Sequence, residues 1–134
     1  MIKKGALYTV LTMMLMFFSC ADHIIESRSD NLEKNVPANI QAIFNGNCAV
    51  AMCHNGTQMP NLSEGLAYTN IVNISSSAGL DYIEPGDTSQ SYLYLKITGA
   101  SGITGSRMPQ GQLPLSDSEI ALIGNWIETG APGE

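Results

Sequence analysis

Two cysteines and a histidine lie close together in one short segment. Cys48 and Cys53 are separated by four residues, and His54 directly follows the second cysteine. This order is typical of covalent haem attachment, in which both sulfurs add to vinyl groups and the imidazole binds the iron. Two intervening residues are usual, and the small residues within the longer bridge allow it to bulge. A ligating imidazole also donates its other N–H to an acceptor, for which we expect the carbonyl of Met59 or Pro60. The motif predicts one haem c, held by the two cysteines with His54 as the proximal iron ligand.

A second iron ligand has to come from another part of the chain. Met52 lies inside the motif and Met59 lies only five residues after His54, so neither easily reaches the opposite face of a haem. Met108 lies in a segment without regular structure, and a thioether is a soft ligand that raises the reduction potential of haem iron. We predict Met108 as the distal ligand, with a methionine that fills a core gap as the alternative. The one other histidine, His23, is a weaker candidate. The remaining methionines belong to the N-terminal segment and are Met1, Met13, Met14 and Met16.

The N-terminus has the pattern of an export signal. Two lysines precede an apolar stretch at 7–18, which has the length of a secretory signal and is too short for an ordinary membrane-spanning helix. The stretch is followed by a small residue and Cys20, as at the cleavage site of bacterial lipoproteins, although Phe18 stands where a small residue is usual. We predict a signal peptide at 1–19 and a lipid on Cys20. Ordinary signal cleavage nearby is the alternative.

Export and charge together limit where the protein acts and what it binds. The predicted location is the periplasmic or cell-surface side of a bacterial membrane, with the lipid at Cys20 as the membrane anchor. Disulfides and haem thioethers form in such a compartment. Removal of residues 1–19 takes away two lysines and no acid, which leaves four Lys and Arg against twelve Asp and Glu, a net charge of −8. This charge argues against nucleic acid and allows basic redox partner proteins. We expect a monomer.

The mature chain divides into a tether and one small domain. Residues 20–37 are polar and charged and lack apolar periodicity, which is typical of a flexible tether. Residues 38–134 have the length of a single domain. This domain has few large apolar side chains, and a buried haem would supply the missing core volume.

Apolar spacing predicts an all-α domain with four short helices and no convincing strand. The expected helices lie at about 38–46, 63–72, 87–98 and 116–129. The last two start at capping-box patterns that begin with Asp87 and Ser116. Residues 99–115 contain too many glycines and prolines for a helix or a central strand. A loop of this length in a small domain is usually functional or disordered.

The folded part resembles a class I cytochrome c domain over residues 38–134. The resemblance lies in Ile43-Phe44, Cys48 to His54, Pro85-Gly86-Asp87, Ser91-Tyr92-Leu93, Arg107-Met108-Pro109, Leu115-Ser116, Glu119-Ile120, Trp126-Ile127 and Gly130-Ala131-Pro132. It implies a small cytochrome c-like fold of about four short helices with long loops around one haem. It also implies that the first and last helices cross at Phe44 and Trp126, and that Met108 is the distal ligand. Arg107 would contact a haem propionate, or else remain solvated.

The predicted function is that of an exported monohaem electron carrier rather than an enzyme. One alternative is a haem-based sensor or accessory module with an open or labile sixth position. Another is a lipoprotein without haem, in which Cys48 and Cys53 form a disulfide. A zinc site fits poorly, because adjacent Cys53 and His54 rarely both bind one tetrahedral ion. Nucleophilic catalysis has no support, because the domain contains no histidine base apart from His54.

Overall fold

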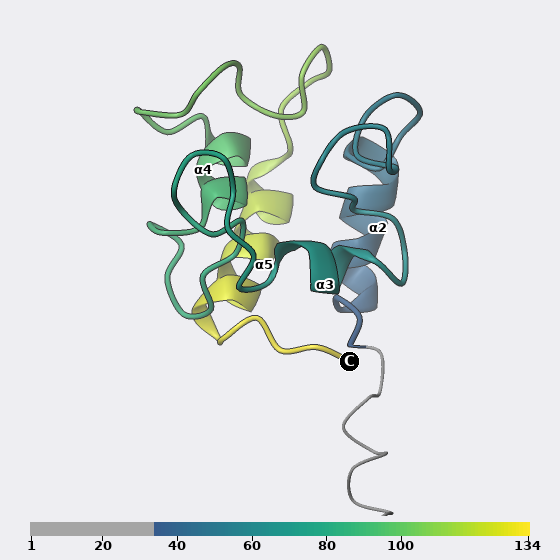
Figure 1. Cartoon of the computed structure of the whole chain (residues 1–134), viewed down its shortest axis with the longest axis vertical. Coiled ribbons are helices and arrows are strands. Elements are labelled where there is room, and N and C mark those ends of the chain that lie inside the picture. Colours follow the sequence, from purple (N-terminus) through teal and green to yellow (C-terminus); the bar gives the residue numbers. More distant parts are fainter. Residues whose placement is uncertain (1–33) are drawn as a thin grey trace, which may run out of the picture. The chain divides into compact units, whose positions relative to one another are not determined.

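The computed structural model describes residues 34–134, and the predicted signal peptide, the Cys20 lipidation site and His23 lie outside them. Within the described part, the helices are α2 (Ala38–Asn47), α3 (Ala67–Ile71), α4 (Tyr92–Thr98) and α5 (Asp117–Glu128). Long loops join them, and residues 34–134 contain no strand beyond isolated bridges at Val72–Ile83 and Ser75–Asp81 (Figure 1). The predicted all-α class is therefore confirmed for this part of the chain.

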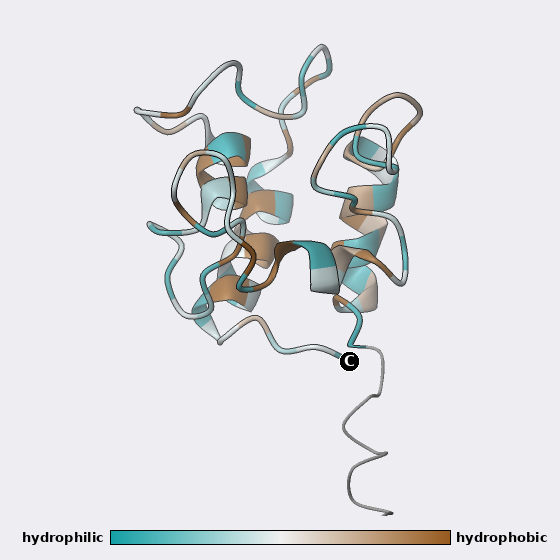
Figure 2. Ribbon diagram, in the orientation of Figure 1, coloured by the Kyte–Doolittle hydropathy of each residue, from teal (hydrophilic) through white to brown (hydrophobic). Residues whose placement is uncertain are grey.

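Helix α2 forms where the sequence pattern predicts it. It starts at Pro37, whose carbonyl accepts the N–H groups of Ile40 and Gln41 at 2.9 Å each. Apolar side chains at i, i+3 and i+4 give the helix one apolar face. That face, with Ile40, Ile43 and Phe44, is buried. Figure 2 shows that α2, α4 and α5 all carry apolar residues, and α5 packs against both of the others.

Helix α5 begins with the predicted capping box. The Ser116 hydroxyl accepts the backbone N–H of Glu119 at 3.3 Å, and the Glu119 carboxylate accepts the backbone N–H of Ser116 at 2.8 Å. Two N–H groups that a helix start leaves unpaired are thereby satisfied. The buried face of α5 includes Ile123, Trp126 and Ile127. The indole N–H of Trp126 donates to the carbonyl of Pro132 at 3.0 Å and holds the last residues against the helix.

Replacing Glu119 with glutamine should reduce the acid sensitivity of the fold. Hydrogen bonds from the backbone and hydroxyl of Ser116 hold the pKa of Glu119 below its ordinary value of 4.5, with Asn47 adding to the effect. A carboxylate whose pKa is lower in the folded state stabilises that state above the unfolded pKa. This stabilisation is lost as the pH falls through the folded-state pKa. Since a charge at a helix N-terminus contributes about 0.3–1 kcal/mol, the variant should be less stable than the parent at neutral pH by about that amount.

Thermal unfolding at neutral pH and near pH 3 would test this prediction, with Glu64→Gln as a control at an exposed carboxylate. The stability difference between Glu119→Gln and the parent should shrink in acid, as the Glu119 carboxylate of the parent takes up its proton. A difference of equal size at both pH values would contradict the assignment.

Two helix predictions are wrong in detail. The helix predicted at 63–72 is shorter, because residues 63–66 form a turn in which Gly65 has a φ of +75°. The capping box predicted at Asp87 does not form. Its carboxylate accepts the N–H groups of Ser89 and Gln90 at 2.8 and 3.2 Å and closes a turn ahead of the helix. Asp commonly binds the amide two residues ahead in this way. The residue that precedes α4 is Ser91, whose hydroxyl is buried and donates to the carbonyl of Asp87.

The folded part begins earlier than the predicted boundary at residue 38. Asn35 and Glu134 exchange backbone N–H to carbonyl hydrogen bonds of 3.0 Å in both directions. Val36 belongs to the buried core. The two ends of the described chain therefore lie side by side. None of the helices within residues 34–134 has the length and apolar character of a membrane-spanning segment.

Candidate cofactor site

A cavity of about 240 Å³ lies between the loop that follows α2, helix α4 and the segment that precedes α5. Its wall includes three of the predicted site residues, namely Cys48, His54 and Met108. A smaller adjoining pocket of about 50 Å³ is lined by the same three residues and by Cys53. The fold therefore brings the two cysteines, the histidine and the distant methionine to one place.

The cysteine-to-histidine segment forms a compact bulged turn at the end of α2. The N–H of His54 donates to the carbonyl of Cys48 at 3.0 Å, and the N–H of Cys53 donates to the carbonyl of Val50 at 3.0 Å. Met52 has a φ of 66°, in the left-handed region, and its side chain is 77% exposed. The segment between the two cysteines thus bulges outward, as its length of four residues predicted.

The His54 ring is oriented by a backbone carbonyl. Its Nδ1 lies 3.1 Å from the carbonyl oxygen of Pro60, which is one of the two predicted acceptors. A carbonyl oxygen can only accept, so Nδ1 carries the proton and Nε2 keeps its lone pair for a metal. The carbonyl of His54 in turn accepts the N–H of Leu62 at 2.7 Å, which closes the loop beneath the ring. The ring is therefore held in the tautomer that a ligand needs.

The two thiols lie in different environments. Cys48 follows the last residue of α2 and is buried, whereas Cys53 is half-buried. Burial raises the pKa of Cys48 to about 11, with smaller contributions from Cys53 and Glu119. Cys48 is consequently a neutral thiol at neutral pH. Both cysteines are free thiols in this structure.

Met108 is presented by the irregular segment that follows α4. Its backbone N–H donates to the carbonyl of Lys96 at 2.9 Å, which ties the segment to the helix. The side chain is half-buried and packs against the core. As predicted, residues 99–115 form no helix or strand.

Arg107 makes contacts at the end of α4, and its predicted propionate contact stays a prediction. Its Nε donates to the carbonyl of Ile97 at 2.7 Å and so binds the C-terminal end of α4. Its side chain packs over Gly99, where an added Cβ would lie 2.8 Å from the arginine Cδ. Gly99 also has a φ of +70°, so glycine at this helix end allows both the left-handed turn and the close contact. Arg107 is not among the residues that line the cavity.

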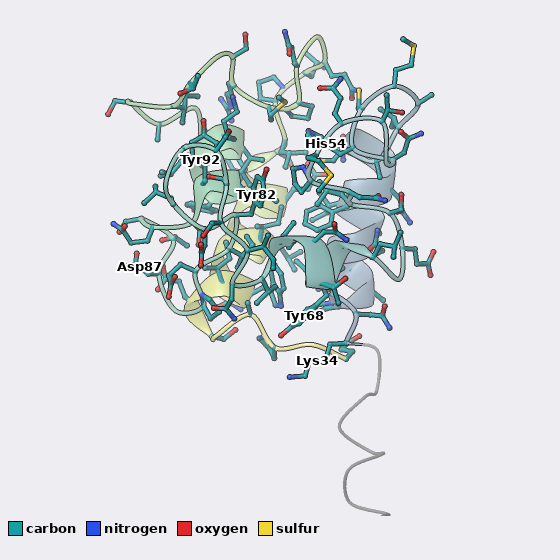
Figure 3. All side chains as sticks on the ribbon, in the orientation of Figure 1. Lys34, His54, Tyr68, Tyr82, Asp87 and Tyr92 are labelled. Carbon is teal, nitrogen blue, oxygen red and sulfur yellow. The ribbon has the colours of Figure 1, made fainter. Side chains whose placement is uncertain are left out.

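Sequence reasoning missed a group of polar residues on the α4 side of the cavity. Tyr92 and Lys96 line it from adjacent turns of α4, and Tyr82 and Thr104 line it from neighbouring loops. The N–H of Thr104 donates to the Tyr92 hydroxyl at 3.1 Å. In Figure 3, His54 comes from the side of α2, whereas Tyr82 and Tyr92 lie on the side of α4. The i, i+4 spacing of Tyr92 and Lys96 is the signal that could have identified this face.

No family model, no curated protein and no solved structure matches the chain. Within residues 34–134, no three His, Cys, Asp or Glu side chains form a group that could hold a metal ion.

Proposed function

We propose that the domain is a monohaem electron carrier of the class I cytochrome c kind. Cys48 and Cys53 would hold one haem c covalently, and His54 and Met108 would bind the iron from its two sides. The observation that carries the proposal is the cavity whose wall unites Cys48, His54 and Met108, with Cys53 beside it.

The residues present suit a haem. The apolar side chains of Phe44, Leu93 and Ile97 line the cavity, and they would pack against the flat apolar ring of a haem. The volume of about 240 Å³ lies below the roughly 300–1,000 Å³ of typical ligand pockets. A group as large as haem would keep part of its surface outside the protein, where a redox partner can approach it.

The two ligand residues have complementary chemistry. The hydrogen bond from His54 Nδ1 to the Pro60 carbonyl makes the ring a better donor at Nε2. The sulfur of Met108 is a soft ligand that favours the ferrous state and raises the reduction potential. A bound haem supplies a one-electron couple, and the protein sets its potential through ligands, burial and nearby charge. If His54 and Met108 both bound the iron, electron transfer would be favoured over reaction of the iron with a small molecule.

The proposal includes export and anchoring. The sequence of 1–19 would direct export, and a lipid on Cys20 would hold the protein at the periplasmic or cell-surface side of a bacterial membrane. Residues 34–134 carry three Lys and Arg against eight Asp and Glu, a charge that suits basic redox partner proteins.

An absorption spectrum of the polypeptide after denaturing extraction would test the proposed function. The protein should be made in an exporting host that matures c-type haem. We expect colour to remain with the chain and sharp α and β bands to appear on reduction. Replacing both Cys48 and Cys53 with alanine should abolish covalent attachment, and His54→Ala should impair maturation or remove the proximal bond. Met52→Ala is the matched control, because Met52 lies in the motif but is 77% exposed.

A colourless parent protein from such a host would refute the proposal. If Cys48 and Cys53 were then found oxidised to each other, the alternative of a disulfide-containing lipoprotein would stand.

A further inference from the structure

Lys96 has a distinctive place in the cavity. It is the only Lys, Arg, Asp or Glu among the residues that line it. The side chain is half-buried, and lysine commonly lays its aliphatic stem along apolar surface while its ammonium reaches a polar environment. A single positive charge therefore lies at the edge of an otherwise uncharged, largely apolar wall.

Two carbonyl groups accept hydrogen bonds from the Lys96 ammonium, which leaves one of its N–H donors for another acceptor. It donates to the carbonyls of Thr104 and Ser106 at 2.8 and 2.5 Å. An ammonium has three N–H donors, and no partner for the third is found within residues 34–134. The lysine carbonyl accepts the N–H of Met108 at 2.9 Å. Lys96 thus holds the segment that carries Met108 by both its side chain and its backbone.

The two edges of a haem carry different groups, and the two sides of the cavity offer a suitable partner for each. Haem carries its vinyl groups and its two carboxylates at opposite edges. The cysteines that would bind the vinyl groups lie at the end of α2, so the carboxylates fall on the side of α4. That side offers the Lys96 ammonium and the hydroxyl groups of Tyr82 and Tyr92. Arg107, the cation expected from the sequence, donates its Nε to the end of α4 and does not line the cavity.

We infer that Lys96 donates its third N–H to a haem propionate and so joins that carboxylate to the segment that presents Met108. This inference rests on the proposed function and deepens it. Lys96 is a positioning residue for Met108, and its positive charge also acts directly on the iron. A positive charge near the iron disfavours the more positive ferric state, so it raises the reduction potential.

Reduction potentials of Lys96 variants of the haem-loaded protein would test the inference. Lys96→Met removes the charge and the donors, whereas Lys96→Gln removes the charge and keeps an amide donor for the two carbonyls. Both should lower the ratio of reduced to oxidised protein at a fixed applied potential by about threefold to tenfold. Lys96→Arg should restore most of the parent value. Lys34→Met is the control, because Lys34 is an exposed lysine at the other end of α2.

If Lys96 acted only by holding Met108 in place, replacing it would have no effect once Met108 is absent. A double variant therefore separates this positioning role from the direct effect of the lysine charge on the iron. In a Met108→Ala background the ligand is already lost, so any remaining effect of Lys96→Gln reports its charge on the haem. We expect the shift to persist there. A shift that vanishes in this background, or unchanged potentials in both single variants, would overturn the inference. If the parent carries no haem, its absorption spectrum refutes the proposed function before any potential is measured.

Discussion

Replacing Met108 with alanine should open the sixth coordination position of the iron and leave the haem covalently attached. Met108 is the methionine whose side chain lines both the main cavity and the pocket that contains Cys53. Without its sulfur the ferric state is relatively more stable, so the reduction potential should fall. Axial ligands set haem potentials over a range of about 0.8 V, so we expect a fall on the order of 0.1 V. The ferrous variant should also bind carbon monoxide.

The measurements are the potential, the carbon monoxide difference spectrum and the weak far-red ferric band of methionine-to-iron ligation. Met59→Ala is the matched control, since Met59 also lines the cavity but is 65% exposed. The parent and Met59→Ala should show the band and Met108→Ala should not. If Met108→Ala kept the parent spectrum and potential, Met108 would not be the ligand. Ready carbon monoxide binding by the parent would favour the sensor alternative.

Among the substitutions considered, replacing Phe44 with alanine should lower the free energy of unfolding the most. The side chain is 1% exposed, lies on the buried face of α2 and lines the cavity. Truncation of a buried phenylalanine costs about 3–5 kcal/mol, because the transfer free energy is lost and a void remains. The total stability of a small domain is about 5–15 kcal/mol, so much of it would be lost.

Thermal or denaturant unfolding of the haem-loaded protein measures this effect, with Leu113→Ala as a control at a side chain that is 87% exposed. The control should change the free energy of unfolding by less than about 0.5 kcal/mol. A loss of similar size in both variants would mean that Phe44 does not belong to the core that holds α2 against α5.

Local patterns predicted the elements whose signals are contained within a few residues. The apolar spacing of α2 and the reciprocal Ser116–Glu119 cap of α5 are of this kind, and both form as expected. The meeting of Met108 with His54 was predicted from ligand chemistry rather than from any local pattern. The structure places both in one cavity wall, and iron ligation remains a prediction.

The start of α4 and the lining of the cavity depend on contacts between residues that are far apart in the sequence, so local patterns do not predict them. Asp87 and Ser91 are both good helix-starting residues. The buried hydroxyl of Ser91, which also accepts the N–H of Glu84 at 2.9 Å, decides where α4 begins. In the same way, nothing local shows that Lys96, and not Arg107, lines the cavity. That distinction arises only when the segment after Gly99 folds back over the end of α4.

The paired chain ends described above place the attachment of the preceding chain at one end of the domain. Asn35 lies just before α2 and Cys48 just after it, and a ten-residue helix is about 15 Å long. Lys34, where the described chain begins, and His54 of the candidate site accordingly lie toward opposite ends of the domain (Figure 3). A partner that approaches the candidate site would therefore not meet the point at which the preceding chain attaches.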